Sequence, residues 1–153
     1  MVRPVLEEAP RVSSANPHFA KNVYFTCIDD RLVKPHQKFI NDIGGAFYVA
    51  IAGGGLTFVS ELEAATAFKQ VAASYQINQI DTVYLESHTG CGAYALAGAK
   101  FSGAAEELER LYTDLDQAAR LVEKALLEAG AKLGEVTVHV QVVNLEGVVQ
   151  PRP

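Results

Sequence analysis

Two short segments of the chain combine residue types that bind metal ions. The segment "CIDDR" begins with Cys27, and the segment "HTGC" runs from His88 to Cys91. Two thiolates and one imidazole favour Zn²⁺ over the harder ions Mg²⁺ and Ca²⁺. Three protein ligands leave one position of a tetrahedral zinc ion open, as in catalytic sites, whereas structural zinc usually takes four. Cys27, His88 and Cys91 are therefore candidate ligands of a catalytic zinc ion.

Each of these residues also has a simpler interpretation. A buried cysteine often serves only as a small apolar side chain, and His88 could be a capping or hydrogen-bonding residue. A thiol redox pair is a third interpretation, but Cys27 and Cys91 are far apart in the sequence and form no C-x-x-C motif. The spacing alone leaves these interpretations open.

Asp29 and Arg31 favour the metal interpretation. They follow Cys27 at intervals of two residues, so on an extended chain the three side chains would share one side. A carboxylate held by an arginine beside a metal is suited to orient a bound water molecule. For this dyad taken alone, a plain surface ion pair is the alternative. Asp29 and Arg31 are the candidate catalytic residues.

Strands must bring these segments together. Short runs of β-branched and aromatic residues predict buried strands at 23–26, 46–52 and 81–87, and a fourth run at 135–147 starts as a strand that could bend back as a fifth after Asn144. Cys27 then ends the first strand, while His88 and Cys91 follow the third. If these two strands are neighbours, the three side chains converge at the carboxyl ends of the sheet, where sites form in α/β proteins.

Helical patterns alternate with the strands, at 34–42, 60–75 and 104–129. The second helix opens with Ser60 and Glu63 in a capping-box pattern and has Leu62 and Ala65 on its apolar face. The third is a long amphipathic helix that could be broken once along its length, and Gly130 caps its end. We expect an α/β fold with a mainly parallel sheet of four to five strands flanked by helices. We expect residues 1–22, which are rich in proline, to form an extended arm, and residues 23–150 to form one zinc-binding domain.

Composition excludes several classes of partner. The net charge of −5 and the lack of any lysine or arginine cluster argue against nucleic acid and against an anionic membrane surface. No stretch reaches the roughly 18 apolar residues of a membrane span, and the N-terminus lacks the apolar core of a signal peptide. We expect a cytoplasmic protein with reduced cysteines, and a bacterial microcompartment is an open alternative.

The two motifs together resemble those of the β-class carbonic anhydrases, which carry C-x-D-x-R and H-x-x-C-G. Here these motifs read "CIDDR" and "HTGCG". The resemblance extends from Val23 to about Gly147: "FYVAIAGGG" stands where the family has its second strand and an Ala-Gly turn, and "VHVQVVNLEG" is similar to its closing strand. The short length is most similar to the compact microbial branch.

The resemblance implies Zn²⁺ held by Cys27, His88 and Cys91, with Asp29 and Arg31 beside the fourth position. It implies reversible hydration of CO₂ to bicarbonate and a proton. Asp29 would orient the reacting water, and Arg31 would keep Asp29 off the metal. The resemblance also implies a homodimer, or an assembly of dimers, with active sites at the subunit interface.

Four positions depart from the family pattern. Ala50 and Ile51 stand where the family has a basic residue and Asn, and Ser87 and Gly90 stand where the compact branch has Gly and Asp. A catalytically silent, zinc-stabilised scaffold or interaction protein is therefore an alternative. A relative that hydrolyses carbonyl sulfide or carbon disulfide with the same ligands is another.

Proton export and self-association are two further expectations. Hydration releases a proton, and His36 or Tyr48 could assist its export, although we expect His36 at the surface. The apolar run from Ala46 to Leu56 and the N-terminal arm favour dimerisation.

Overall fold

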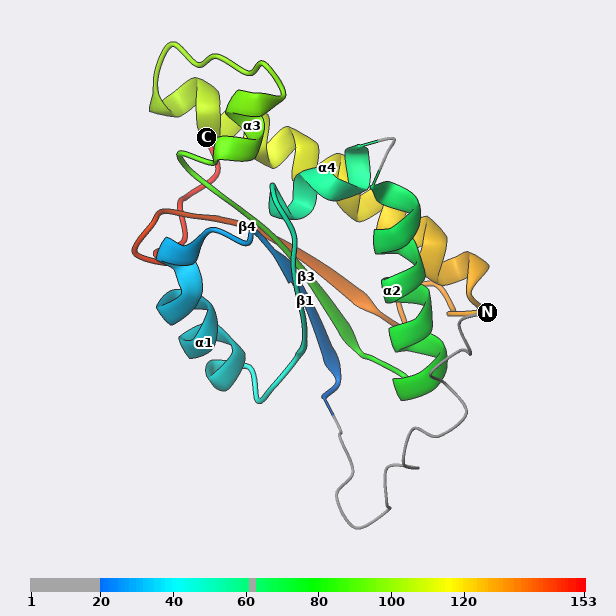
Figure 1. Ribbon diagram of the computed structural model, residues 1–153. Helices are drawn as coiled ribbons and strands as arrows, with labels where there is room; N and C mark the ends of the chain where they lie inside the picture. The colour runs from blue at the N-terminus through cyan, green and yellow to red at the C-terminus, as the bar shows by residue number, and fades with distance from the viewer. Residues whose placement is uncertain (1–19, 61–62) are drawn as a thin grey trace, which may run out of the picture.

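A computed structural model of the chain describes residues 20–60 and 63–153 (Figure 1). Four strands form one parallel sheet in the order β2-β1-β3-β4. Their bounds are β1 Asn22–Thr26, β2 Phe47–Ala50, β3 Thr82–His88 and β4 Thr137–Val143. The predicted α/β class with a parallel sheet is confirmed. All but the last three residues of the predicted arm lie outside the described residues, and Asn22 already belongs to β1.

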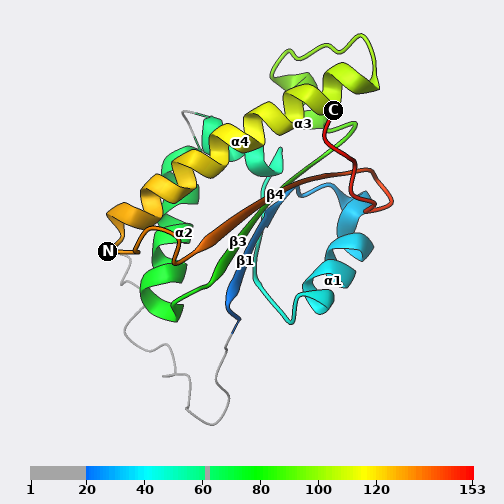
Figure 2. The ribbon, with the colours of Figure 1, turned by 180° about the vertical axis from the view of Figure 1, so that it is seen from behind.

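Helices cover both faces of the sheet. The helices are α1 Val33–Asp42, α2 Ala64–Asn78, α3 Gly92–Leu96 and α4 Ala104–Glu128, with 3₁₀ turns at Asp30–Leu32 and Gly54–Val59. Figures 1 and 2 show α2 and α4 on one face and α1 on the other. Phe25 of β1 accordingly packs on Phe58 of the second 3₁₀ turn, while the preceding Tyr24 packs on Phe39 of α1.

The central strands β1 and β3 are buried on both faces because each has a neighbour on either side and helices above and below. This explains the uninterrupted apolar runs within them, residues 23–25 of β1 and 83–85 of β3. The main core lies between the sheet and the helices α2 and α4; its fully buried members include Val23, Phe25, Val71, Val83, Leu85, Leu111, Leu115 and Val122. The strand predicted at 46–52 is present as β2, but the prediction that it is buried is wrong. β2 is an edge strand, and Tyr48 on it is 44% exposed.

Two further features differ from the sequence prediction. After Asn144 the chain turns back but forms only an isolated bridge between Val143 and Val149, so the described residues contain no fifth strand. The Asn144 side chain accepts the N–H groups of Glu146 and Val148 and holds this turn closed. α4 runs unbroken over 25 residues, because its apolar stripe continues along the sheet without interruption.

The predicted start of the second helix is wrong. α2 begins at Ala64, and its N-cap is Glu63 without a side-chain hydrogen bond, because Ser60 ends the preceding 3₁₀ turn instead. Of the predicted apolar face, Leu62 lies outside the described residues and Ala65 is exposed, whereas Ala67 and Val71 are buried. Among the described helices none is both long and apolar enough to cross a bilayer.

Candidate metal centre

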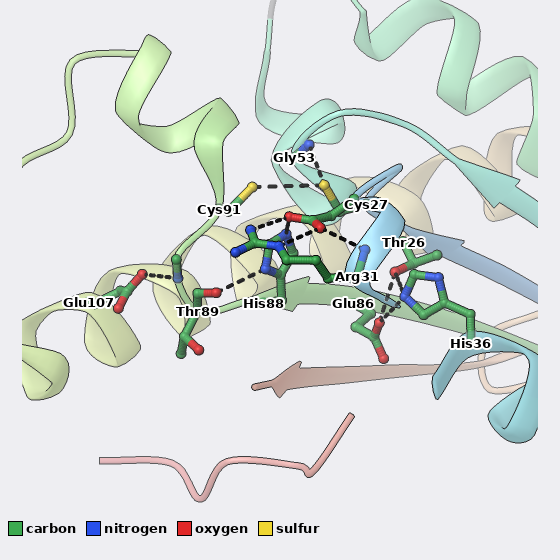
Figure 3. Close-up of polar contacts among 12 residues, drawn as sticks. Thr26, Cys27, Arg31, His36, Gly53, Glu86, His88, Thr89, Cys91 and Glu107 are labelled. Atoms are coloured by element: carbon green, nitrogen blue, oxygen red, sulfur yellow. Dashed lines mark hydrogen bonds and ion pairs between the residues drawn. The ribbon is translucent and has the colours of Figure 1, made fainter. Parts of the chain in front are cut away.

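The carboxyl ends of β1 and β3 bring the three predicted ligands together (Figure 3). Cys27 directly follows β1, His88 is the last residue of β3, and Cys91 is the N-cap of α3. β1 and β3 are paired neighbours in the sheet. One ligand atom from each residue lies within 4.8 Å of the other two, and the two sulfur atoms are 3.9 Å apart. All three residues are buried.

One ring nitrogen of His88 lies close to the two cysteine sulfur atoms. Its Nδ1 lies 2.9 Å from the carbonyl oxygen of Thr89, which requires the proton to be on Nδ1. Its Nε2 is then a lone-pair atom, and within the described part of the chain this buried atom has no hydrogen-bond partner. A buried polar atom without a partner is costly. A cation between Nε2 and the two sulfur atoms would supply that partner, so the residues present fit Zn²⁺.

The electrostatics of the two cysteines also favour a cation. Hydrogen bonding by Cys91 lowers the pKa of Cys27 despite its burial, and hydrogen bonding to Cys27 raises that of Cys91. Burial opposes protonation of His88, but the neighbouring Cys27 sulfur and the Thr89 carbonyl oxygen, with a smaller effect of the Asp29 carboxylate, outweigh it and raise its pKa. The lowered pKa of Cys27 favours one thiolate at this point, next to the His88 ring and the Cys91 thiol. A divalent ion would neutralise it and convert both thiols to thiolates.

A glycine turn closes the site on the side of Cys27. The backbone N–H of Gly53 donates to the Cys27 sulfur over 3.4 Å. Gly54 follows with φ +54°, and a Cβ atom on it would lie 2.2 Å from the Glu86 carbonyl oxygen and 3.1 Å from the Cys27 nitrogen. Only a residue without a side chain permits this approach to both strand ends. The glycine turn of residues 53–55 therefore lies directly against the ligand-bearing strands.

Asp29 and Arg31 form a fork-shaped ion pair beside the ligands. Arg31 donates from Nε to Oδ1 over 2.8 Å and from Nη2 to Oδ2 over 2.5 Å, and its backbone N–H reaches Oδ1 over 3.1 Å. These hydrogen bonds hold the pKa of Asp29 well below its ordinary value. Asp29 Oδ2 is 3.7 Å from His88 Nε2, so the carboxylate lies next to the ligand set. The expectation of an extended segment is wrong here: Asp29 caps the 3₁₀ turn 30–32, and that turn brings the pair together.

Sequence reasoning missed a buried polar cluster next to the centre. His36 was expected at the surface, but it is only 3% exposed, because α1 presses it against Glu86, which is 2% exposed. Glu86 was the available signal, since an acidic residue in the strand sequence "VYLESH" cannot be buried without partners.

The departures from the family pattern fall in different places. Ala50 ends β2 opposite Thr26, and the N–H of Ile51 donates to the Thr26 carbonyl, so both lie near the end of β1. Ser87 is buried. Gly90 adopts φ +69° in a turn, and its backbone N–H donates to the Glu107 carboxylate. None of the four replaces a ligand or a member of the dyad.

Comparison with solved structures identifies the fold. A β-carbonic anhydrase of the fungal pathogen Aspergillus fumigatus superimposes with a TM-score of 0.53 and 17% identity, over 86% of this chain and 74% of that one. A Coccomyxa β-carbonic anhydrase, in complex with acetazolamide, gives 0.54 and 18%, over 90% and 73%. A carbon disulfide hydrolase in its apo form gives 0.49 and 15%, over 89% and 80%.

Sequence comparison adds nothing to this likeness. No protein-family model matches the chain, and no curated protein matches it. At the identities above, the structural likeness concerns the fold. The chain has the fold of the β-carbonic anhydrases, which confirms the resemblance found in its two motifs.

Proposed function

We propose that the chain is a zinc-dependent carbonic anhydrase, which hydrates CO₂ reversibly to bicarbonate and a proton. The observation that carries the proposal is the arrangement of Cys27, His88 and Cys91 around one point, with an arginine-locked carboxylate beside them. The β-carbonic anhydrase fold supports it. In this proposal Cys27, His88 and Cys91 hold the metal, and Asp29 and Arg31 serve the reaction.

The ion and the chain have separate tasks. Zinc held by three protein ligands supplies Lewis acidity that makes water nucleophilic near neutral pH. Because two of the ligands are thiolates, which donate more charge than imidazoles, we expect this activity to be shifted to alkaline pH. The Asp29 carboxylate stays ionised and can accept a hydrogen bond from the reacting water, which fixes the direction of its lone pair.

Arg31 controls the position of Asp29. Both carboxylate oxygens are occupied by the guanidinium fork, and Oδ1 also accepts the Arg31 backbone N–H. Such a bidentate pair fixes the plane and direction of the carboxylate more tightly than a single contact. Arg31 would therefore keep Asp29 from binding the metal as a fourth protein ligand, although Asp29 lies close to the ligand His88.

The test combines metal analysis with a hydration assay on the purified full-length chain. We expect one zinc per chain and CO₂ hydration measurable by stopped flow. Asp29→Asn should retain the zinc and lose most of the hydration activity, because the amide replaces one acceptor oxygen by a donor. Zinc without CO₂ hydration would refute the proposal. In that event, turnover of carbonyl sulfide or carbon disulfide would identify the hydrolase, and no turnover would favour the scaffold.

We also propose that the chain acts as a homodimer. Among the described residues β2 lies at the edge of the sheet with no strand on its outer side. The large apolar side chains of Ile28 and Val33, close to the metal ligands in sequence, are each 60% exposed. An exposed strand edge and apolar side chains are typical of an interface. Light scattering at micromolar concentration should give the mass of a dimer or a multiple of it. A monomer with full activity would refute this proposal.

A further inference from the structure

A hydrogen-bonded cluster with three buried side chains at its centre, here called the buried cluster, lies on the face of the sheet that α1 covers. It consists of Thr26, His36, Tyr48, Glu86 and Gln141, and Figure 3 shows its centre, with Thr26, His36 and Glu86. Thr26 Oγ1 donates to Glu86 Oε1 over 2.8 Å, and Gln141 Nε2 donates to Glu86 Oε2 over 2.6 Å. His36 Nε2 lies 3.1 Å from Glu86 Oε1 and 2.9 Å from Thr26 Oγ1.

One assignment of hydrogen atoms satisfies every contact in this buried cluster. His36 carries its proton on Nε2 and donates it toward Glu86 and Thr26. Its Nδ1 then accepts the hydroxyl proton of Tyr48 over 2.8 Å. Glu86 accepts from three side chains, and these come from β1, α1 and β4. The contacts are therefore mutually consistent, and they join α1 and all four strands at one point.

Stability alone gives little reason for such a cluster. Burying a carboxylate and an imidazole costs free energy that their hydrogen bonds only offset, and apolar side chains of similar size often give an equally stable core. What a satisfied polar cluster adds is direction, because each hydrogen bond requires one distance and one orientation. The question is which part of the molecule needs that precision.

The buried cluster lies within two residues of a metal ligand at the ends of both β1 and β3. Thr26 is the last residue of β1 and directly precedes Cys27, and Glu86 precedes His88 by two residues on β3. The Thr26 and Glu86 side chains lie on one face of the sheet, because they are hydrogen-bonded to each other. The hydrogen bond from Thr26 to Glu86 thus joins the two strands immediately before they deliver their ligands. The Gly54 turn packs against the same two points, the Glu86 carbonyl and the Cys27 nitrogen.

We propose that the buried cluster positions Cys27 and His88 for the metal, with the Thr26–Glu86 hydrogen bond as its decisive contact. The ends of β1 and β3 are held at a fixed separation, and α1 presses His36 onto the junction from the outside. Thr26 and Glu86 are positioning residues: they act through Cys27 and His88. The inference rests on the metal centre of the proposed function and is independent of which substrate that centre acts on.

The experiment measures zinc affinity of the full-length chain by competition with a chromophoric chelator, together with the visible absorption of the Co²⁺-substituted protein. Thr26→Val removes the hydroxyl with little change in shape, and Thr26→Ser restores it. Loss of a group that orients metal ligands weakens metal binding by about 10–100-fold. We expect a loss of this size and a shifted Co²⁺ spectrum in Thr26→Val, and wild-type behaviour in Thr26→Ser. Glu86→Gln should resemble Thr26→Val, and it decides the matter if the valine variant does not fold.

The matched control is Val71→Ala, which opens the core on α2, on the opposite face of the sheet from α1 and the buried cluster (Figure 1). It should lower the thermal midpoint and leave both zinc affinity and the Co²⁺ spectrum unchanged. Wild-type zinc affinity in Thr26→Val and Glu86→Gln would overturn the inference, and so would an equal loss in Val71→Ala, which would mark a general effect of stability. A wild-type chain that binds no zinc would overturn the metal centre itself and the inference with it.

Discussion

Replacing Gly54 by alanine tests whether the glycine turn determines the metal centre. The added Cβ atom would lie 2.2 Å from the Glu86 carbonyl oxygen, whereas carbon and oxygen normally approach to about 3.3 Å. The turn would have to move by about 1 Å. Left-handed backbone costs a non-glycine residue about 1–2 kcal/mol, and overpacking costs about 1–3 kcal/mol. We expect Gly54→Ala to lose about 2–5 kcal/mol of the free energy of unfolding.

A loss of this size lowers the melting temperature of a domain of this length by roughly 4–20 °C, which calorimetry measures directly. Movement of the turn should also break the hydrogen bond from Gly53 to the Cys27 sulfur and weaken zinc binding. The control is Gly55→Ala. Its Cβ atom would meet the end of the Leu115 side chain, which lies in the core, so stability falls while zinc binding is retained. A Gly54→Ala protein with wild-type stability and zinc content would refute this reasoning.

Three shorter predictions concern the ligands and the dyad. Cys91→Ser should lose most of the zinc, measured by metal analysis, because a hydroxyl is a far poorer ligand for zinc than a thiolate. Arg31→Ala should keep its zinc but lose hydration activity, and a changed Co²⁺ spectrum should report the freed Asp29 carboxylate at the metal; near-normal turnover would leave the dyad no role. The pKa of Asp29 is depressed in the folded chain, so its contribution to stability is present above the unfolded value of about 4 and is lost as the pH falls below it. The stability difference between wild type and Asp29→Asn, from urea unfolding, should therefore be constant near neutral pH and shrink in acid, and a difference independent of pH would contradict this.

The sequence determined the elements and the chemistry at their ends. Side-chain periodicity and residue type are local properties, so the parallel sheet, the long amphipathic helix and the position of Cys27 directly after a strand could all be read from the chain. The donor types of Cys27, His88 and Cys91 likewise favoured zinc before any geometry was known. The two motifs also indicated the fold that the solved structures show.

Only the tertiary structure decided which distant groups meet. The start of α2 was predicted too early because the chain at Gly53, Gly54 and Gly55 forms a 3₁₀ turn that extends to Val59. The burial of β2 was predicted wrongly because its apolar sequence does not reveal that the strand lies at the edge of the sheet. His36 gave no local sign of burial. Its environment is set by Glu86, 50 residues further along the chain, and by the packing of α1 over β3. A residue pattern records how each side chain alternates along its own element, but the burial of a polar group depends on a partner supplied by another element, and that choice is made by the packing of the whole sheet.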